Sequence, residues 1–326
     1  MLSHKEQGEK HLKIDVIIPI YKPGRELFVL LDRLKEQSLP VRKIILMNTG
    51  RENFTGLITE AEFAQRYPNA EVHHLEKKDF DHGGTRHKAT EYSEAGIFVM
   101  MTQDAMPADR YLLEHLVEHL GEKAAAAYAR QLPDASSSEL EKVSRRFNYP
   151  EESRIKGLDD LQDLGIKVFF CSNVCAAYRR DIYDKLGGFT RRTIFNEDML
   201  YAAKAVKAGY KIAYEAKARV IHSHNYTNLQ QLRRNFDLGV SQADHPEIFK
   251  MATSESEGMR LVKDTWNSLK KKNQLYRFPG FCLQCAFKYT GYLLGKHYKS
   301  LPHALILHLT SNPDYWTNDP PIPPNL

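Results

Sequence analysis

The sequence predicts an α/β fold, a mostly parallel central sheet with flanking helices, followed by a C-terminal helical extension. Short apolar runs of the kind found in buried strands alternate with segments that have apolar residues at helical spacing. This alternation implies parallel strands joined by right-handed crossovers. From Thr227 onward only the helical spacing persists. A length of 326 residues suits one large domain with an appendage, or two modest domains.

The expected elements follow in chain order. The expected strands are residues 14–20, 43–47, 70–75, 97–101, 124–130, 210–214 and 219–221, with further apolar segments at 168–172 and 174–178. The expected helices are residues 25–37, 59–67, 85–95, 109–120, 180–186 and 199–208. The polar segment 133–161 predicts a mobile lid or an acceptor loop that carries a short helix.

The composition is that of an ordinary globular enzyme, with 42% hydrophobic and 27% charged residues. The net charge of +5 is mild and predicts no nucleic-acid partner; a phosphate-binding groove or simply solvated surface accounts for it equally well. The four cysteines form two close pairs with apolar neighbours, which favours buried free thiols over a zinc site. The first residues lack an apolar signal core, and no apolar run approaches the roughly 20 residues of a membrane span. We therefore expect a cytoplasmic protein.

The stretch from Asp79 to Pro107 organises the predicted site. Its polar DFDHGG segment predicts an open loop, in which two glycines permit positive φ and close approach of another molecule. Thr85 is placed to cap the following helix and Gly96 to end it. The buried-type strand 97–101 then ends at Asp104, and open α/β sheets bind ligands beyond the carboxyl ends of their strands. We expect one crevice lined by the strand ends at Tyr21, Asn48, 79–86 and Asp104.

Neither GxGxxG nor GxxxxGK[ST] occurs in this part of the sequence, so dinucleotide redox and P-loop chemistry are not expected. Asp104 and the histidines His222 and His224 follow separate predicted strands, and they meet if those strands point the same way. Carboxylate and imidazole together suit Mn²⁺ well and Mg²⁺ acceptably. Such a cation would neutralise charge on a diphosphate leaving group, and Arg86 at a helix start could hold the same phosphates.

A second acidic pair, Glu197 and Asp198, precedes the helix expected at 199–208. Carboxylates at a helix start are often caps stabilised by the helix dipole. Either carboxylate could also take the proton from an incoming hydroxyl. Together, a cation site, a phosphate-binding arginine and a base suit the transfer of a group from a nucleoside-diphosphate donor to an alcohol.

Five motifs in order, VIIPIYKPG, FDHGGTRHKA, TQDA, NED and HSHNY, resemble the family 2 glycosyltransferases, and within them the bacterial rhamnosyltransferases. The resemblance covers roughly residues 14 to 230. It implies one GT-A domain, a Rossmann-like fold, that uses a divalent metal and inverts the anomeric centre in one displacement. The domain division expected on this basis is a polar tail 1–12, a GT-A domain 13–226, a helical extension 227–310 and an extended tail 311–326.

The resemblance also implies roles for residues. Asp104 matches the last Asp of the DxD motif and would bind metal; His222 matches a position that reaches the metal or diphosphate, with His224 as the alternative. Asp198 would be the catalytic base, with Glu197 in support. The residues expected to contact the donor are Pro19, Tyr21, Asn48, Asp79, Asp81, Gly83, Gly84, Arg86 and Gln103. The sequence departs from the family pattern at Thr102, which replaces the first Asp of DxD, and at Asn48, where an Asp is usual.

The TQDA and HGGTR forms resemble the rhamnosyl branch, which implies dTDP-L-rhamnose as donor and a hydroxyl of a glycan, commonly lipid-linked, as acceptor in bacterial surface polysaccharide synthesis. Two alternatives remain open: a family 2 enzyme that uses a UDP-sugar, and a non-catalytic nucleotide- or glycan-binding subunit.

In the C-terminal part, basic residues such as Lys270–Lys272 lie among aromatic ones such as Tyr276, Phe281 and Tyr289. This mixture is typical of a helix at a membrane interface, here the inner face of the cell membrane, or of a helical appendage whose apolar face is core. The sequence leaves both interpretations open.

Overall fold

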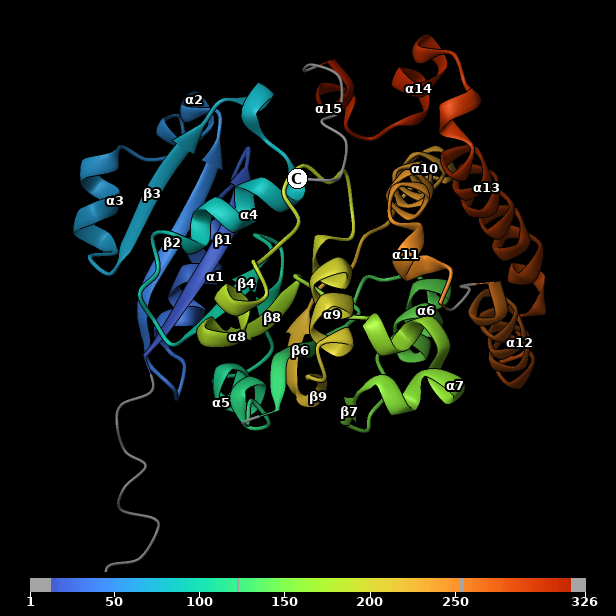
Figure 1. The fold of residues 1–326 in the computed structure, drawn as a ribbon, viewed down its shortest axis with the longest axis horizontal. Coiled ribbons are helices and arrows are strands. Elements are labelled where there is room, and N and C mark those ends of the chain that lie inside the picture. The colour runs from blue at the N-terminus through green and yellow to red at the C-terminus, as the bar shows by residue number, and fades with distance from the viewer. Residues whose placement is uncertain (1–12, 122, 252–254, 318–326) are drawn as a thin grey trace, which may run out of the picture.

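The computed structural model describes residues 13–121, 123–251 and 255–317. The tail expected over 1–12 and the end of the tail expected over 311–326, residues 318–326, lie outside the described residues. Within the described part, one nine-stranded sheet has the order β3-β2-β1-β4-β8-β6-β9-β5, and β7 pairs with β9 (Figure 1). The strands are β1 Ile14–Tyr21, β2 Val41–Thr49, β3 Ala70–Leu75, β4 Ile97–Met101, β5 Met106–Pro107, β6 Ala124–Leu132, β7 Arg154–Lys156, β8 Cys175–Arg179 and β9 Lys211–Ile221.

Helices flank the sheet and then continue as an extension on one side (Figure 1). Those in the first part of the chain are α1 Glu26–Lys35, α2 Arg51–Thr55, α3 Glu60–Arg66, α4 His82–Thr90, α5 Leu112–Val117, α6 Glu139–Asn148, α7 Leu161–Leu164, α8 Arg180–Lys185 and α9 Glu197–Lys207. The extension contains α10 Asn228–Asp244, α11 Pro246–Phe249, α12 Glu255–Lys271, α13 Phe278–Lys296, α14 His303–Leu309 and α15 Pro313–Thr317. None of the described helices is both long enough and apolar enough to cross a bilayer.

Strand direction decides which residues share an edge of the sheet. Strands β1 to β4 are parallel, whereas β8 is antiparallel to both of its neighbours, β4 and β6. Two reversals restore the original direction, and β9 is parallel to β6, so β9 runs the same way as β4. The ends of β4, β6 and β9 and the start of β8 therefore lie along one edge. The predicted common edge for Asp104 and the histidines is confirmed.

Three elements differ from the sequence-based expectation. Segments 210–214 and 219–221 form a single strand, β9, because the register jumps from Glu215 to Arg219 across a bulge and pairing with β6 resumes. Pro107, expected only to stop a strand, lies in β5 at the sheet edge, where a proline costs no hydrogen bond to a further strand. Segment 168–172 is not a strand: a short 3₁₀ helix covers Gly165–Phe169.

The expected open loop at the two glycines is helical. Helix α4 begins at His82, and Asp81 caps it by accepting a hydrogen bond of 2.7 Å from the N–H of Gly84, a role expected of Thr85. Neither glycine has a positive φ. Gly83 is required for a different reason: a Cβ there would lie 1.9 Å from the carbonyl oxygen of Thr190. The close approach is therefore by the chain's own backbone.

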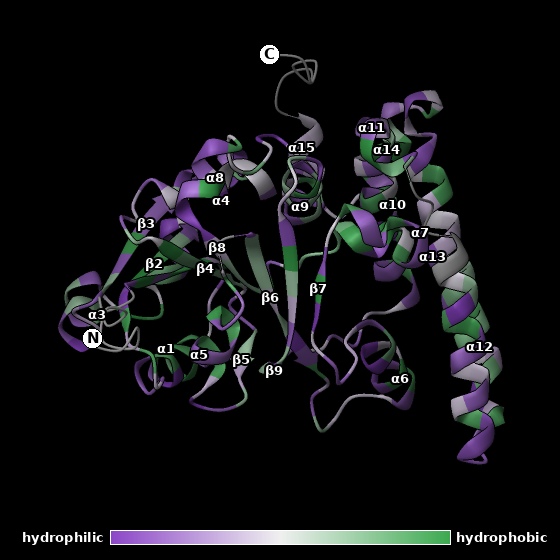
Figure 2. Ribbon diagram, turned by 60° about the horizontal axis from the view of Figure 1, so that its bottom comes forward, coloured by the Kyte–Doolittle hydropathy of each residue, from purple (hydrophilic) through white to green (hydrophobic). Residues whose placement is uncertain are grey.

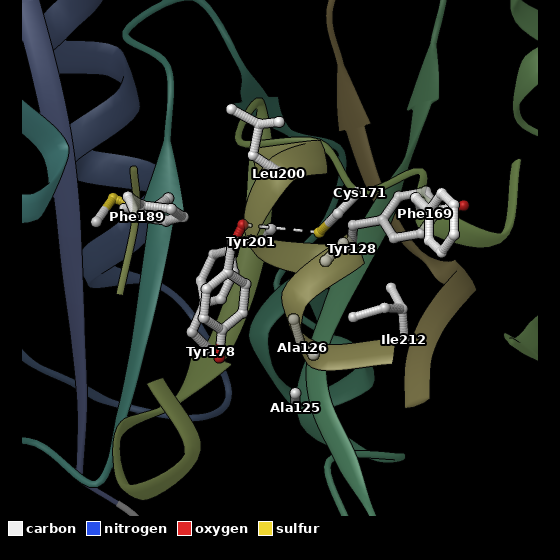
Figure 3. Close-up of a cluster of buried hydrophobic side chains, with 14 of the residues drawn as sticks. Ala125, Ala126, Tyr128, Phe169, Cys171, Tyr178, Phe189, Leu200, Tyr201 and Ile212 are labelled. Atoms are coloured by element: carbon white, nitrogen blue, oxygen red, sulfur yellow. Dashed lines mark hydrogen bonds between the residues drawn. The ribbon is translucent and has the colours of Figure 1, made fainter. Parts of the chain in front are cut away.

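A cluster of buried aromatic rings holds α9 against the sheet (Figure 3). Tyr178 on β8 packs edge-on against Tyr201 of α9 at 5.3 Å between ring centroids, and Phe189 packs against both. Offset and edge-on ring pairs stabilise by about 0.5–1.5 kcal/mol each beyond the burial of their area. This packing fixes the first turn of α9, which carries the acidic pair, relative to the strand ends.

The extension is held by close helix contact. Helices α10 and α13 meet at Gly239, Gly291 and Gly295, where an added Cβ would lie 2.1–2.3 Å from a backbone oxygen of the opposite helix. The chain then returns toward the N-terminal half, and residues 313–317 form α15 beside Lys77–Asp79 instead of an extended tail (Figure 1). The expectation of buried thiols holds for Cys171 and Cys175 and is wrong for Cys282, which is exposed.

Candidate active site

Asp104, His222 and His224 meet at the common edge of β4 and β9. Oδ2 of Asp104 lies 3.5 Å from Nε2 of His222 and 3.3 Å from Nε2 of His224. One ligand atom from each residue lies within 4.8 Å of the others, and the two imidazole rings are nearly perpendicular. Both histidines therefore lie beside the carboxylate, whereas His224 was expected only as the alternative to His222.

Gln131, the penultimate residue of β6, determines which nitrogen of His222 faces this cluster. Arg145 of α6 donates a hydrogen bond to Oε1 of Gln131, which shows that this atom is the amide oxygen. Nδ1 of His222 lies 3.0 Å from the same oxygen and must donate to it. In the neutral ring, the lone pair of Nε2 then points at Asp104.

A lone pair and a carboxylate oxygen at this distance repel each other unless a cation or a second proton lies between them. Burial favours the neutral acid, but when His222 carries its second proton, its hydrogen bond and its positive charge hold the pKa of Asp104 well below its usual range. Burial, then His222, lowers the pKa of His224 to about 4. One ionised carboxylate and two imidazoles, one of them oriented by a hydrogen bond at its far nitrogen, fit a divalent cation.

Asp198 lies in the first turn of α9, partly buried, with both carboxylate oxygens in hydrogen bonds. Oδ2 accepts from the N–H of Asn173 at 2.9 Å and Oδ1 from the N–H of Met199 at 2.8 Å. The second contact satisfies a free N–H of the first turn, but Asp198 is not the cap residue of α9: that position is Asn196, whose side chain accepts no capping hydrogen bond. Burial and the neighbouring charge of Glu197 raise the pKa of Asp198, which makes it a stronger base than an ordinary aspartate.

Glu197 is buried and has fixed partners. Its Oε1 lies 3.2 Å from a guanidinium nitrogen of Arg86 and accepts from Nδ2 of Asn173 at 3.0 Å. Burial opposes ionisation of Glu197, but Arg86 and then His82 outweigh it and lower its pKa. The pKa values of the two adjacent carboxyl groups are thus shifted in opposite directions, the pattern expected when one acts as a base and the other stays ionised in support.

Segment 172–174, just before β8, connects the two halves of the site. Nε2 of Gln131 lies 3.0 Å from Oγ of Ser172, and the next residue, Asn173, contacts both Glu197 and Asp198. The carbonyl of Val174 accepts from the N–H of Thr102, beside the metal-type cluster. Sequence reasoning missed Gln131 and Asn173. Each had a signal in the sequence: Gln131 is an amide side chain at the end of an apolar strand, and Asn173 is an amide side chain between two apolar segments.

The residues expected to contact the donor fall into two groups. Tyr21 and Asp81 line a cavity of about 370 Å³ at the ends of β1 and β2. The other seven residues expected to contact the donor do not line this cavity.

The residues of the second group have partners within the protein or lie elsewhere. The side chain of Gln103 accepts from the backbone N–H of Tyr21 at 2.9 Å and donates to its carbonyl at 3.1 Å, and the amide nitrogen of Asn48 donates to the carbonyl of Gly50. Pro19 is partly buried in β1, Asp79 is exposed after β3, Gly83 and Gly84 lie in α4, and Arg86 is buried against Glu197.

Arg234 on α10 is a further candidate that sequence reasoning missed. Its guanidinium lies over the ring of Phe195, at 4.7 Å from the centroid, and 5.7 Å from that of Tyr226. Phe195 precedes the acidic pair and Tyr226 follows the histidines, so the exposed Arg234 lies between the two motifs.

Comparison with known proteins decides the family. The model of glycosyl transferase family 2 matches residues 15–187, which is more than half of the chain. The chain belongs to glycosyl transferase family 2. This family 2 enzyme is 38% identical over 310 residues to the O-antigen chain rhamnosyltransferase RfbN of Salmonella typhimurium, covering 94% of this chain and 97% of the relative. It is also 38% identical to the O-antigen chain rhamnosyltransferase WbaN of Salmonella anatum, with 93% and 95% covered.

A solved structure with a similar fold is the mannosyltransferase PcManGT from Pyrobaculum calidifontis, in complex with GDP-Man and Mn²⁺. The TM-score is 0.61 at 14% identity, and 88% of each chain is covered. The predictions of the family, of a GT-A-like α/β fold and of a glycosyltransferase are confirmed.

Proposed function

We propose that this family 2 glycosyltransferase transfers L-rhamnose from dTDP-L-rhamnose to a hydroxyl of a glycan in surface polysaccharide synthesis. The sugar follows from the two rhamnosyltransferases that match along almost their full lengths. The chemistry rests on one observation: segment 172–174 joins the Asp104 cluster to Asp198 through direct contacts with Gln131 and Asp198.

Asp104, His222 and His224 hold a divalent cation, Mn²⁺ or Mg²⁺, in this proposal. When bound, the cation supplies positive charge to the diphosphate that leaves the sugar. Arg234, held between aromatic rings, adds a guanidinium for the same phosphates. Tyr21, Asp81 and the neighbouring Thr49 line the cavity that receives the nucleoside; its volume of about 370 Å³ lies within the usual range for ligand pockets.

Asp198 takes the proton from the acceptor hydroxyl. The acceptor oxygen attacks the anomeric carbon from the face opposite the diphosphate, the bond to the diphosphate oxygen breaks, and dTDP leaves with that electron pair. The configuration inverts in this single displacement. Glu197 stays ionised against Arg86 and raises the pKa of the base beside it.

The variant Asp198→Asn tests the base. General base catalysis contributes about 10²–10⁴-fold, so we expect transfer to fall by that factor while Mn²⁺ and dTDP still bind. Asp184→Asn is the matched control, because Asp184 is exposed on α8 and paired with Arg180. Retained turnover in Asp198→Asn would contradict the assignment.

A donor screen tests the sugar nucleotide. We expect dTDP-L-rhamnose to be consumed in preference to UDP-glucose and UDP-GlcNAc when Mn²⁺ is present, measured as released nucleotide and as glycosylated acceptor. Preferential use of a UDP-sugar would replace the donor and leave the family unchanged.

We also propose that α12 and α13 rest on the inner face of the cell membrane, where a lipid-linked acceptor would be found. These helices lie at the edge of the molecule and mix hydrophobic with hydrophilic residues along their length (Figure 2). The exposed apolar side chains there include Met259, Trp266, Tyr276, Leu283 and Tyr289, which are 42–72% exposed. Lys270, Lys271 and Lys288 supply charge for anionic headgroups, whereas Lys272 pairs with Glu139 of α6 at 2.6 Å.

Flotation with vesicles tests this contact. We expect binding to phosphatidylglycerol vesicles and loss of binding in the double variant Trp266→Ala/Leu283→Ser. Tyr111→Ser is the control, because Tyr111 is 47% exposed next to α5. Equal behaviour of the double variant and the control would contradict the proposal.

A further inference from the structure

The C-terminal strap, residues Ser311–Thr317, borders the cavity at the ends of β1 and β2. Its helix α15 lies beside the segment that follows β3 (Figure 1). Five of the thirteen residues that line the cavity belong to it: Ser311, Asn312, Pro313, Asp314 and Tyr315. These residues come long after the last of the five motifs in the sequence. We propose that the strap completes the nucleoside-binding pocket and holds the nucleoside of the donor, an inference that rests on the proposed function of this site.

The strap is anchored at its beginning by Asp237 of α10, whose side chain is buried. Oδ1 of Asp237 accepts from the hydroxyl of Thr310 at 2.6 Å, and Oδ2 accepts from the N–H of Ser311 at 2.9 Å. Hydrogen bonds to a carboxylate are stronger than those between neutral groups. Ser241 of α10 accepts a hydrogen bond from Asn196 and donates one to the carbonyl of Phe195, so the anchor is tied to the segment that precedes α9.

The middle of the strap is tied to the sheet domain by an ion pair. Nζ of Lys77 lies 2.8 Å from Oδ2 of Asp314, and both side chains are about half exposed, at 62% and 42%. Trp316 packs edge-on against Tyr298 at 5.3 Å between ring centroids. The strap therefore spans from the helical extension to the segment after β3.

The lining chemistry suits a nucleoside. Tyr21, Phe80 and Tyr315 provide aromatic surface for a base, while Thr49 and Asn312 provide donors and acceptors for a base edge or a ribose. The aromatic and polar groups come from both sides, so neither the strand ends nor the strap alone encloses the base. The helical extension would then have the role of carrying the strap to the donor.

Calorimetric titration of the full chain with dTDP, UDP, GDP and inorganic pyrophosphate, each with Mn²⁺, tests the proposal. In Tyr315→Ala we expect dTDP affinity to fall at least about fivefold, the lower bound for loss of aromatic stacking on a base. Pyrophosphate affinity should stay within about twofold of wild type, because the strap faces the nucleoside.

The ion pair supplies an independent test that keeps the aromatic wall intact. Asp314→Lys and Lys77→Asp should each weaken dTDP binding, and the double exchange should restore it. Asp184→Lys is the control, since it makes the same charge change on α8, outside the residues that line the cavity.

The proposal is overturned if Tyr315→Ala and both single exchanges keep wild-type dTDP affinity, or if pyrophosphate binding falls by the same factor as dTDP binding. Wild-type preference for UDP or GDP would instead contradict the proposed donor. The strap variants would then be judged on the preferred nucleotide, so the two failures are distinguishable.

Discussion

The variant Gln131→Met tests whether the hydrogen bond that orients His222 contributes to metal binding, while His222 itself is kept. Gln131 is 3% exposed at the end of β6, and methionine has similar length and fills the same space. The substitution removes the oxygen that accepts from Nδ1 of His222 and from Arg145, and it also removes the amide nitrogen that donates to Ser172. Arg145 keeps its ion pair with Glu141 at 2.7 Å, so its charge is not left alone.

The expected effect follows from the tautomer. With the acceptor gone, the proton of neutral His222 is free to occupy Nε2, the nitrogen that faces Asp104. Loss of a hydrogen-bond partner behind a metal ligand typically weakens metal binding 10–100-fold, which corresponds to about 1.4–2.7 kcal/mol. We therefore expect the dissociation constant for Mn²⁺ to rise by that factor, with donor turnover restored at higher Mn²⁺.

The assay is titration with Mn²⁺ followed by electron paramagnetic resonance, alongside thermal unfolding. Gln37→Met is the matched control, because Gln37 is also buried and bonded but lies beside α5, bound to the carbonyl of Asp109 and the N–H of Leu113. Unchanged Mn²⁺ affinity in folded Gln131→Met would refute the reasoning. An equal loss in Gln37→Met would refute it as well, since the effect would then be one of stability.

Two further predictions concern the buried polar half of the site. Glu197→Gln removes a negative charge beside Asp198 and therefore lowers the pKa of that base. Because Asp198 acts only when ionised, the acidic limb of the plot of kcat/KM against pH should move to lower pH. An unmoved limb would exclude Asp198 as the titrating base. Gly83→Ala places a Cβ 1.9 Å from the carbonyl oxygen of Thr190 and should lower the free energy of unfolding, measured by chemical denaturation, by about 1–3 kcal/mol. The control is Gly96→Ala, whose added Cβ meets nothing within 4 Å and should lower it by less than about 0.5 kcal/mol. Equal losses in the two variants would contradict the packing argument.

Local pattern was enough to predict the strands that form the first half of the sheet and the position of Asp104 at a strand end. A short apolar run followed by polar residues has that meaning in almost any parallel sheet. The same local logic was wrong at the glycine pair. Composition alone indicated a turn, whereas the segment is helical and Gly83 leaves room for the backbone at Thr190, which is distant in sequence.

The sequence by itself determined the family, the GT-A-like fold, and which carboxylates and imidazoles are available for chemistry, because motifs and strand periodicity are local properties. Only the tertiary structure decided that β9 runs parallel to β4, which follows from two antiparallel pairings with β8. It also decided that Gln131 orients His222 and that Tyr315 reaches the cavity of Tyr21. Such contacts join residues far apart in the chain, and they depend on how the sheet and the extension pack, which no local pattern encodes.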